Sequence, residues 1–420
     1  MKGSIRKTGE NKWRLVFDLD RGIDGKRRQK VKRFSGNKKG AEKKLRDTIR
    51  EYEEGNYIDP SEQTLGEFLD YWLDMVKGAV ELKTFERYQQ MARVNIKPVL
   101  GSIKVQRLET RHLDEAYALL LNEGRHDGDG GLAPKTIRNI HGVLSMALKK
   151  AVAWKMILTN PAAEVTLPKV ERQEVKVLTK ERSADLLASC EGRWLHPIVF
   201  TALMTGMRRG EIAALRWRNV NLKDGWIRVA ASIEVTRGGR REKDVKTKHS
   251  RRRISLPPVA VDYLEQHKSR EAEKRLRLGS GLDGDAYVFT TDDCRMRAPE
   301  LISEEFAKLA KKQKIDITFH GLRHTHISQL LADGHPITTV SRRAGHAATS
   351  ITLDIYGHVM PDSQERMMEE FGAEYEVELE RARNKAAESC DQSVTKQRFT
   401  GAKSLTNMVT PAGLEPALPG

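Results

Sequence analysis

Three short stretches of this 420-residue sequence carry side chains suited to chemistry at a phosphate. They are residues 205–211, residues 320–325, and residues 344–346 followed by Tyr356. Arginine binds two non-bridging phosphate oxygens with one planar fork and keeps its charge. Histidine moves protons near neutral pH, and a tyrosine hydroxyl can attack phosphorus and hold it as an ester. The combination indicates cutting and rejoining of DNA strands.

The first stretch predicts an arginine that points into a cleft. Arg208 follows a turn over residues 205–207 and precedes a short helix expected over 211–215. Glu211 is placed to hold the guanidinium of Arg208 or Arg209. Taken alone, the stretch is explained equally well as an ordinary pair of surface arginines.

The second stretch predicts a histidine and an arginine on one helix face. His320 and Arg323 are three residues apart, so a helix that begins near Phe319 places them side by side. The N-terminus of that helix adds partial positive charge towards a phosphate. We expect His324 and His326 to be polar surface residues rather than ligands. Because no carboxylate accompanies them at ligand spacing, the sequence disfavours zinc.

The third stretch predicts the nucleophile. His346 lies on a turn, and the following helix, capped by Thr349 or Ser350, carries Tyr356. A free tyrosine has a pKa of about 10, so its hydroxyl needs help at neutral pH. We expect nearby cations to lower the pKa of Tyr356 and a histidine to accept its proton. The ordinary alternative is a packing residue at a helix end.

A basic hairpin over residues 245–253 offers a lysine that could protonate a departing 5′ oxygen. Lys243, Lys246 and Lys248 all compete for this role. Basic hairpins more often serve only as phosphate contacts. The residues alone therefore leave the choice open.

The composition predicts globular domains without a membrane segment. Hydrophobic residues make up 39% of the chain and charged residues 31%, and no apolar run approaches the ~18 residues of a membrane helix. The N-terminus lacks the apolar segment of a secretion signal, so we expect a cytoplasmic protein. The three cysteines are widely spaced and indicate neither disulfides nor a zinc site.

Most of the positive charge lies in the first 50 residues, which hold 18 Lys and Arg against 6 Asp and Glu, or +12 of the net charge of +16. Alternating apolar residues over 13–19 predict a strand, residues 24–25 a hairpin turn, and residues 29–34 a returning strand. The returning strand carries the candidate DNA-binding residues Lys30, Lys32 and Arg33. With a helix over 41–52, these strands predict a small basic sheet suited to a DNA groove.

The remaining pattern predicts a multidomain protein, mainly α-helical with small β-sheets. We expect an N-terminal ββ(β)α module over residues 1–56, a helical unit over 62–168 and a mixed α+β unit over 175–375. Within the last unit, strands are expected over residues 226–230, 253–256 and 287–291. Residues 376–420 should form an exposed charged helix over 376–389 and a disordered tail from residue 391.

Taken together, the three stretches resemble the motifs of the tyrosine recombinases of the phage-integrase type, with a similar layout over residues 1–370. The resemblance implies an arm-type DNA-binding module, a SAM-like helical core-binding domain and a catalytic domain. By position it implies the catalytic set Arg208, Lys246, His320, Arg323, His346 and Tyr356. Gly321 replaces a common aspartate and Ala344 a common leucine, which affects packing rather than catalytic groups.

The reaction that the resemblance implies begins with attack of Tyr356 on the scissile phosphate. It yields a 3′-phosphotyrosine and a free 5′-hydroxyl, which then attacks the phosphotyrosine of a partner duplex. Arg208 and Arg323 would stabilise the transition state, with Lys246 as general acid. His320 and His346 would assist by proton transfer and hydrogen bonding. One ester replaces another at each step, so no metal or other cofactor is implied.

The implied partners are double-stranded DNA attachment sites, further copies of the chain in a homotetramer on DNA, an excisionase and a host DNA-bending protein, without a membrane. Residues 376–389 are the candidate contact between copies. The leading interpretation is site-specific integration of a prophage or conjugative element. A Xer-like resolvase would not need the basic N-terminal module, and a type IB topoisomerase shares only the chemistry. A non-catalytic DNA-binding regulator on the same scaffold is disfavoured by the intact Arg, His and Tyr positions.

Overall fold

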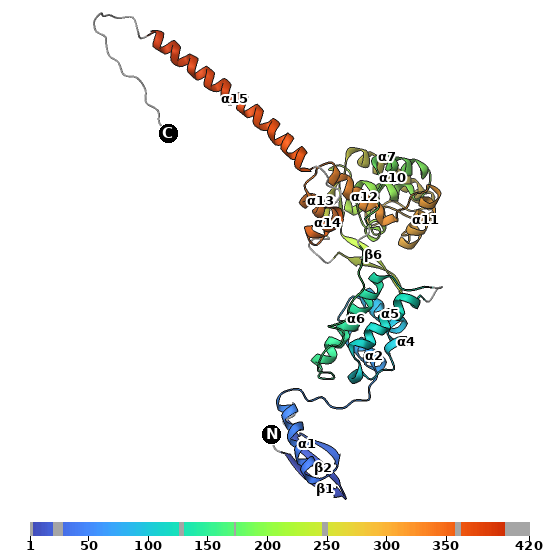
Figure 1. The fold of residues 1–420 in the computed structure, drawn as a ribbon. Helices are drawn as coiled ribbons and strands as arrows, with labels where there is room; N and C mark the ends of the chain where they lie inside the picture. Colours follow the sequence, from blue (N-terminus) through green and yellow to red (C-terminus); the bar gives the residue numbers. More distant parts are fainter. Residues whose placement is uncertain are drawn as a thin grey trace, which may run out of the picture. The chain divides into compact units, whose positions relative to one another are not determined.

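The computed structural model describes residues 3–19, 28–125, 130–171, 174–245, 251–357 and 363–399. The chain forms two compact units, one of residues 1–174 and 231–244 and one of residues 175–230 and 245–420. Helices dominate, and the sheets are small and antiparallel (Figure 1), which confirms the predicted fold class. Among the described residues, none of the helices combines the length and the apolar character that a membrane crossing requires.

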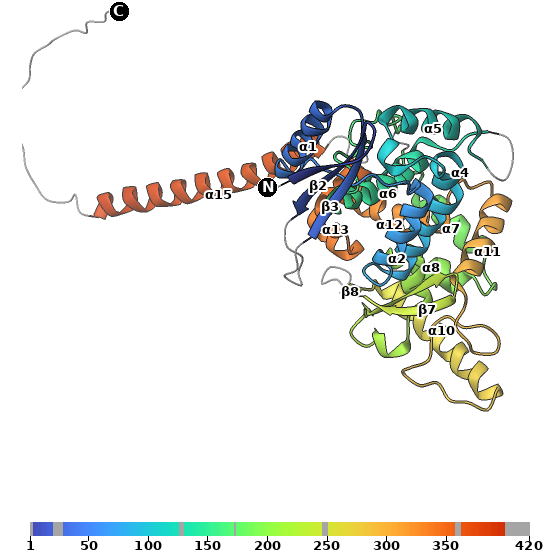
Figure 2. The same cartoon turned by 90° about the horizontal axis from the view of Figure 1, so that it is seen from below.

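The N-terminal module is a three-stranded antiparallel sheet with one helix along it (Figure 2). Its elements are β1 (Gly3–Gly9), β2 (Lys12–Leu19), β3 (Arg28–Ser35) and α1 (Lys38–Glu53). Leu15 and Phe17 are buried with Ala41 and Leu45 of α1, because strand residues two apart share a face. The predicted alternation is confirmed, whereas the predicted turn at residues 24–25 lies outside the described residues.

The middle of the first unit is helical, as the sequence predicts. Its elements are α2 (Leu65–Val76), α3 (Leu82–Gln90), the π-helix η1 (Met91–Ile96), α4 (Lys97–Leu100), the 3₁₀ turn η2 (Val105–Arg107), α5 (Thr110–Glu123) and α6 (Pro134–Ala153). Thr64 and Glu67 form a reciprocal capping box at the start of α2, which confirms the predicted cap. The predicted face of α2, with Phe68, Leu69 and Trp72, is buried in one core with α5 and α6.

A hairpin from the later sequence belongs to this first unit. It consists of β6 (Ala231–Thr236) and β7 (Gly239–Asp244). The Arg237 amide donates to the Glu86 carboxylate at 2.8 Å, and Lys243 pairs with Glu81 at 3.0 Å. These bonds hold the hairpin beside α3, so Lys243 forms its ion pair within the first unit.

The second unit packs helices around α12, which has buried residues on all sides. Its helices are α7 (Lys180–Ser189), α8 (His196–Thr205), α9 (Arg209–Ala213), α10 (Pro258–Arg277), α11 (Pro299–Lys312), α12 (Phe319–Ala332), α13 (Ile337–Ala344), α14 (Thr349–Tyr356) and α15 (Ser363–Phe399). Its sheet is β4 (Val220–Asn221), β5 (Trp226–Val229) and β8 (Arg252–Ser255), with the 3₁₀ turn η3 (Trp217–Asn219) before it. The strands expected over 226–230 and 253–256 are therefore confirmed within one residue.

Three local predictions in this unit are wrong. Residues 287–291 form isolated bridges rather than a strand; Val288 and Phe289 are buried, so their apolar pattern reflects core packing. Helix α14 has Ala348 at its N-cap and no side-chain cap from Thr349 or Ser350. Helix α9 begins at Arg209, two residues earlier than predicted, because Arg208 caps it through Glu211.

The C-terminal prediction also needs correction. One continuous helix, α15, runs from Ser363 to Phe399 (Figures 1 and 2), whereas the sequence predicted a helix over 376–389 and disorder from residue 391. The prediction is therefore wrong for residues 391–399, and residues 400–420 lie outside the described residues. Several large apolar side chains of α15 are exposed, namely Met367, Met368, Phe371, Tyr375, Val377 and Leu379. Four of these six side chains lie before residue 376, and Val377 and Leu379 lie inside the predicted contact segment 376–389.

Candidate active site

Arg208 stands at the start of α9, where a carboxylate orients it. Its Nη1 donates to Glu211 Oε1 at 2.9 Å, and its backbone amide donates to Glu211 Oε2 at 2.8 Å. Its Nη2 donates to the carbonyl of Gly345 at 3.0 Å. The side chain keeps 38% of its surface exposed. The guanidinium is thus fixed on one side and open to a ligand on the other.

Glu211 is 3% exposed and also binds a second arginine. Arg252 of β8 donates through Nη1 and Nη2 to both carboxylate oxygens, at 3.0 and 2.8 Å, and through Nε to the carbonyl of Arg343 at 2.7 Å. Burial raises the pKa of Glu211, but the bonds and charges of Arg252 and Arg208 outweigh it and leave the pKa lowered. The sequence prediction named Glu211 as a holder of Arg208 or Arg209 and missed Arg252.

Arg323 projects from the first turns of α12 and is 3% exposed. Its Nη1 donates to the carbonyl of Gly206 and its Nη2 to the carbonyl of Ala344, both at 2.7 Å. Burial, followed by the charge of Arg208, lowers the pKa of Arg323 to about 9. A buried cation that also faces another cation is stabilised by an anion, so the pair favours a phosphate between them.

Two of the predicted histidines lie in the same electrostatic field. His346 bonds Thr352 through Nδ1 at 2.8 Å, and burial, then the charges of Arg323 and Arg208, lower its pKa to about 4. The pKa of His320 is lowered first by desolvation, then by His324 and Arg323. Both imidazoles are neutral at pH 7 without a ligand.

Tyr356 is 1% exposed and packs in a small apolar cluster with Ile327, Leu331, Val340 and Ala344. Its hydroxyl is hydrogen-bonded to Nδ1 of His324. Burial raises the pKa of Tyr356, and the charge of Arg323 offsets only part of that shift. The expectation of a lowered pKa is therefore wrong, because desolvation of the phenolate outweighs the nearby cation.

The interpretation of His326 as a surface residue is also wrong, and His324 is half-buried against the hydroxyl of Tyr356. His326 is 9% exposed; its Nε2 accepts a hydrogen bond from Nε of Arg343 at 3.0 Å, and its Nδ1 bonds the carbonyl of Leu203 at 2.7 Å. Burial and then the charge of Arg343 lower the pKa of His326 to about 3, so the ring is neutral. Arg343 in turn donates to the carbonyls of Ser255 and Met204. This pair ties α12 and α13 to α8.

Five of the six predicted catalytic residues therefore meet in the second unit. Arg208 and Arg323 bond the adjacent carbonyls of Gly345 and Ala344, and His346 follows directly. His320 and His346 lie within the electrostatic reach of both arginines, and Tyr356 bonds the residue after Arg323. Lys246 lies outside the described residues. No three His, Cys, Asp or Glu side chains in the described ranges cluster as metal ligands.

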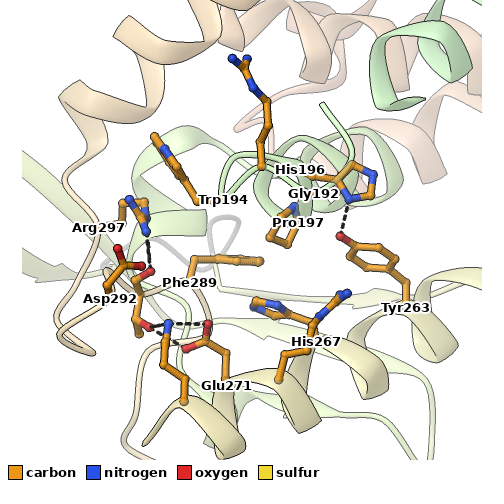
Figure 3. Close-up of a pocket in the computed structure, with 14 residues that line it drawn as sticks. Gly192, Trp194, His196, Pro197, Tyr263, His267, Glu271, Phe289, Asp292 and Arg297 are labelled. Carbon is orange, nitrogen blue, oxygen red and sulfur yellow. Dashed lines mark hydrogen bonds and ion pairs between the residues drawn. The ribbon is translucent and has the colours of Figure 1, made fainter. Parts of the chain in front are cut away.

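A hollow of about 320 Å³ lies elsewhere in this unit and contains none of the predicted site residues. In Figure 3 its walls show Arg297 near Trp194, with the guanidinium carbon 4.0 Å from the ring centroid, and Tyr263 bonded to His196 at 2.8 Å. Glu271 accepts from Lys274 at 2.7 Å and from Thr290 at 2.6 Å (Figure 3). Its polar groups thus bond one another, as in a structural polar cluster.

The three predicted DNA-binding residues of the N-terminal module fall on opposite faces of the sheet. Lys32 is paired in register with Leu15 and Lys30 with Phe17, so both lysines share the helix-covered face. Lys30 forms an ion pair with Asp59, and Lys32 lies 4.4 Å from the ring centroid of Tyr57. Both are therefore engaged by the segment after α1.

Arg33 instead points to the other face. It is paired with Arg14, and Arg14 with Arg6, so three arginines form one row across β3, β2 and β1. All three residues are exposed. Like charges directly opposite one another destabilise a sheet, and a polyanion on this face relieves that repulsion. The sequence prediction missed Arg6 and Arg14, although the alternation in the predicted strand over 13–19 already placed Arg14 on the face opposite the buried Leu15 and Phe17.

Comparisons with known proteins agree with this architecture. The profile of the Phage integrase family matches residues 172–362, and that of the Phage integrase N-terminal SAM-like domain matches residues 64–120. The Tyrosine recombinase XerC-like protein of Caldanaerobacter subterraneus subsp. tengcongensis is 27% identical over 88% of this chain and 97% of its own. An integrase of Streptomyces ambofaciens is 28% identical over 83% of this chain and 90% of its own.

Solved structures show the same fold at lower identity. The Tn1549 transposon integrase in complex with a circular intermediate DNA has a TM-score of 0.63 at 20% identity, covering 74% of this chain and 99% of that one. A lambda integrase tetramer bound to a Holliday junction has a TM-score of 0.52 at 17% identity, covering 82% and 98%. From the matched profiles, the full-length relatives and the shared fold, the chain belongs to the phage integrase family of tyrosine recombinases.

Proposed function

We propose that this protein is a site-specific DNA recombinase that cuts and rejoins DNA strands through a 3′-phosphotyrosine, integrating and excising a mobile element. The observation that carries the proposal is the set of two fixed arginines, two neutral histidines and one tyrosine in the second unit. Relatives named as integrases, including the ICEBs1 integrase of Bacillus subtilis, support the integrating role. The reaction belongs to the type IB class of strand transfer.

In the proposed mechanism, Oη of Tyr356 attacks the scissile phosphate and the P–O5′ bond breaks. Arg208 and Arg323 bind the non-bridging oxygens and stabilise the added charge of the pentacoordinate transition state. His320 and His346 are neutral in the free protein and hydrogen-bond those oxygens. Lys246 gives a proton to O5′, a role that rests on the family resemblance alone. Reversal with a different 5′-hydroxyl completes strand exchange.

We assign the N-terminal module, residues 1–56, to accessory arm-type DNA sites, with the arginine row of Arg6, Arg14 and Arg33 as its contact. The helical domain over residues 62–168 and the catalytic domain over 175–375 bind the core site. The proposed partners of the protein are double-stranded attachment sites, an excisionase and a host DNA-bending protein. Its proposed location is the bacterial cytoplasm.

Four copies assemble on two duplexes in this proposal, with α15, which contains the predicted contact segment 376–389, as the contact between copies. A chain truncated after Gly357 should still bind a single core site but should lose the four-copy complex in native gels. Retained four-copy assembly by that truncation would remove α15 from the proposal. The Tn1549 and lambda integrase structures, solved with DNA, support DNA as a partner of this protein.

A nicked suicide substrate tests the proposal. The attachment site is found by sequencing the DNA that flanks the gene, and a duplex nicked near the crossover loses its 5′-hydroxyl strand after cleavage. The wild-type protein should accumulate a covalent adduct, stable to detergent, on the 3′ side. Tyr356→Phe should bind the same duplex without the adduct. An adduct formed by the Phe variant, or none formed by the wild type, would contradict the assignment.

A further inference from the structure

The hydroxyl of Tyr356 needs a proton acceptor, and its contacts identify one. At most about one tyrosine in a thousand is ionised at neutral pH with an ordinary pKa, and burial makes phenolate rarer here. His346 directs Nδ1 to Thr352. Within the described residues, the hydrogen bond of the Tyr356 hydroxyl goes to Nδ1 of His324.

The place of His324 in α12 suits it for this contact. It follows Arg323 directly, so the helix that presents the phosphate-binding guanidinium also presents the imidazole. It lies one turn after His320, and the two rings meet edge to face with centroids 4.8 Å apart. The ring of Tyr356 is packed by Ile327 and Leu331 of the same helix. Residues of α12 thus both pack the apolar ring of Tyr356 and hydrogen-bond its hydroxyl.

The protonation state of His324 also fits. Burial, followed by the charge of Arg323, lowers its pKa, so the ring is neutral at pH 7. A neutral imidazole carries one N–H and one lone pair. With the proton on Nε2, Nδ1 accepts a hydrogen bond from the tyrosine hydroxyl.

We propose that His324 is a further catalytic residue, the general base that holds the Tyr356 hydroxyl through Nδ1 and takes its proton during attack on phosphorus. The inference rests on the proposed function. In the cleavage step the Tyr356 O–H bond breaks, its proton passes to Nδ1, the Oη–P bond forms, and the P–O5′ bond breaks. O5′ takes a proton from the separate general acid. In the joining step the imidazolium returns its proton to the departing phenolic oxygen, so no co-reactant is consumed.

The test uses His324→Asn, because the asparagine amide occupies the place of Nδ1 and retains a polar contact without a basic nitrogen. The full-length protein is measured in single-turnover cleavage of the nicked duplex. A second duplex carries a 5′-bridging phosphorothiolate, whose sulfur leaves without protonation. Lys246→Ala should recover on this second duplex, because only the general acid is bypassed. His335→Gln, at an exposed histidine after α12, is the matched control.

We expect His324→Asn to bind DNA normally but to cleave on the order of 100-fold more slowly on both duplexes. The wild-type rate should fall at low pH as His324 takes up a proton, and this acidic limb should be absent from the variant. Should the Asn variant not fold, His324→Gln gives the same comparison. Wild-type rates, recovery on the phosphorothiolate duplex, or an unchanged acidic limb would each overturn the role of His324. Absence of any wild-type adduct would instead reject the proposed function.

Discussion

Arg323 donates through Nη1 to the carbonyl of Gly206, 117 residues earlier in the chain, at 2.7 Å. Gly206 ends α8 with a φ of +64°, a left-handed conformation that turns its carbonyl into the site. Gly345 ends α13 in the same way, with a φ of +70°, and its carbonyl accepts from Arg208. Each of the two arginines proposed to bind phosphate is therefore oriented by the carbonyl of a glycine that ends a helix.

Gly206→Ala should destabilise the fold by about 1–3 kcal/mol, because a side chain strains the left-handed backbone. A Cβ there would also lie 2.6 Å from Cδ2 of His326. Urea unfolding of the full chain measures the loss. Gly142→Ala is the matched control, since Gly142 lies within α6 with nothing within 4 Å of its Cβ position. Gly142→Ala should stabilise the protein by about 0.5–1 kcal/mol. Equal effects of Gly206→Ala and Gly142→Ala on stability would contradict the prediction.

Glu211→Gln should destabilise the protein by about 3 kcal/mol or more, since it leaves the buried Arg252 without its countercharge. Arg208 also loses its orienting carboxylate, so strand cleavage should slow even where the variant remains folded. Thermal unfolding and single-turnover cleavage measure the two effects. In the control Glu273→Gln, the ion pair with Arg277 is 64–75% exposed, and stability should change by less than about 0.5 kcal/mol. A stable, fully active Glu211→Gln protein would refute the buried-carboxylate role.

Acid should destabilise the fold through His326. Its pKa is about 3 when folded and ~6.5 when unfolded, so the unfolded chain binds more protons between these values. Stability is therefore complete above pH ~6.5 and declines as the pH falls below it. Between pH 7.5 and 5 this residue alone should cost about 2 kcal/mol.

His326→Gln should flatten that pH dependence by about the same 2 kcal/mol, while retaining an acceptor for Arg343. Urea unfolding at a series of pH values gives the slope. His335→Gln shows whether the loss of any histidine produces the effect. An unchanged slope in the His326 variant would show that the ring is not buried neutral.

Arg33→Gln should weaken binding of the protein to isolated accessory-site DNA more than Lys30→Gln does. Arg33 faces outward in the arginine row, whereas Lys30 faces α1 and is paired with Asp59. Each lost phosphate contact should lower the slope of log affinity against log salt by roughly 1. Binding titrations of the full chain on accessory-site DNA at several salt concentrations measure this. A larger effect from Lys30 would place the DNA on the other face.

The pattern of the candidate site was predictable because each of its parts is local. Arg208, Arg323 and Tyr356 follow from helix spacing and turn residues, and the structure places all three on the predicted elements or at their caps. The alternation of residues in β8 could also have revealed a buried arginine. Arg252 shares the buried face of the strand with Ile254, whereas Arg253 and Ser255 point outward. A charged residue at an inward strand position indicates a buried ion pair.

What the sequence did not reveal depends on burial. The roles of His324 and His326 follow from the position of α12 at the centre of its unit, which no local spacing encodes. The raised pKa of Tyr356 likewise arises from an apolar cluster assembled from α12, α13 and α14. Local rules state which groups are near in the chain, whereas desolvation depends on everything packed around a group.

The pairing of two guanidinium groups, those of Arg208 and Arg252, with the one buried carboxylate of Glu211 couples folding to ligand binding. Without a bound anion, the second unit retains uncompensated positive charge, and this repulsion subtracts from its stability. A phosphodiester that enters supplies the missing countercharge, so the free protein should melt at a lower temperature than its DNA complex. Added salt should narrow that gap, since dissolved ions weaken the attraction that the nucleic acid provides.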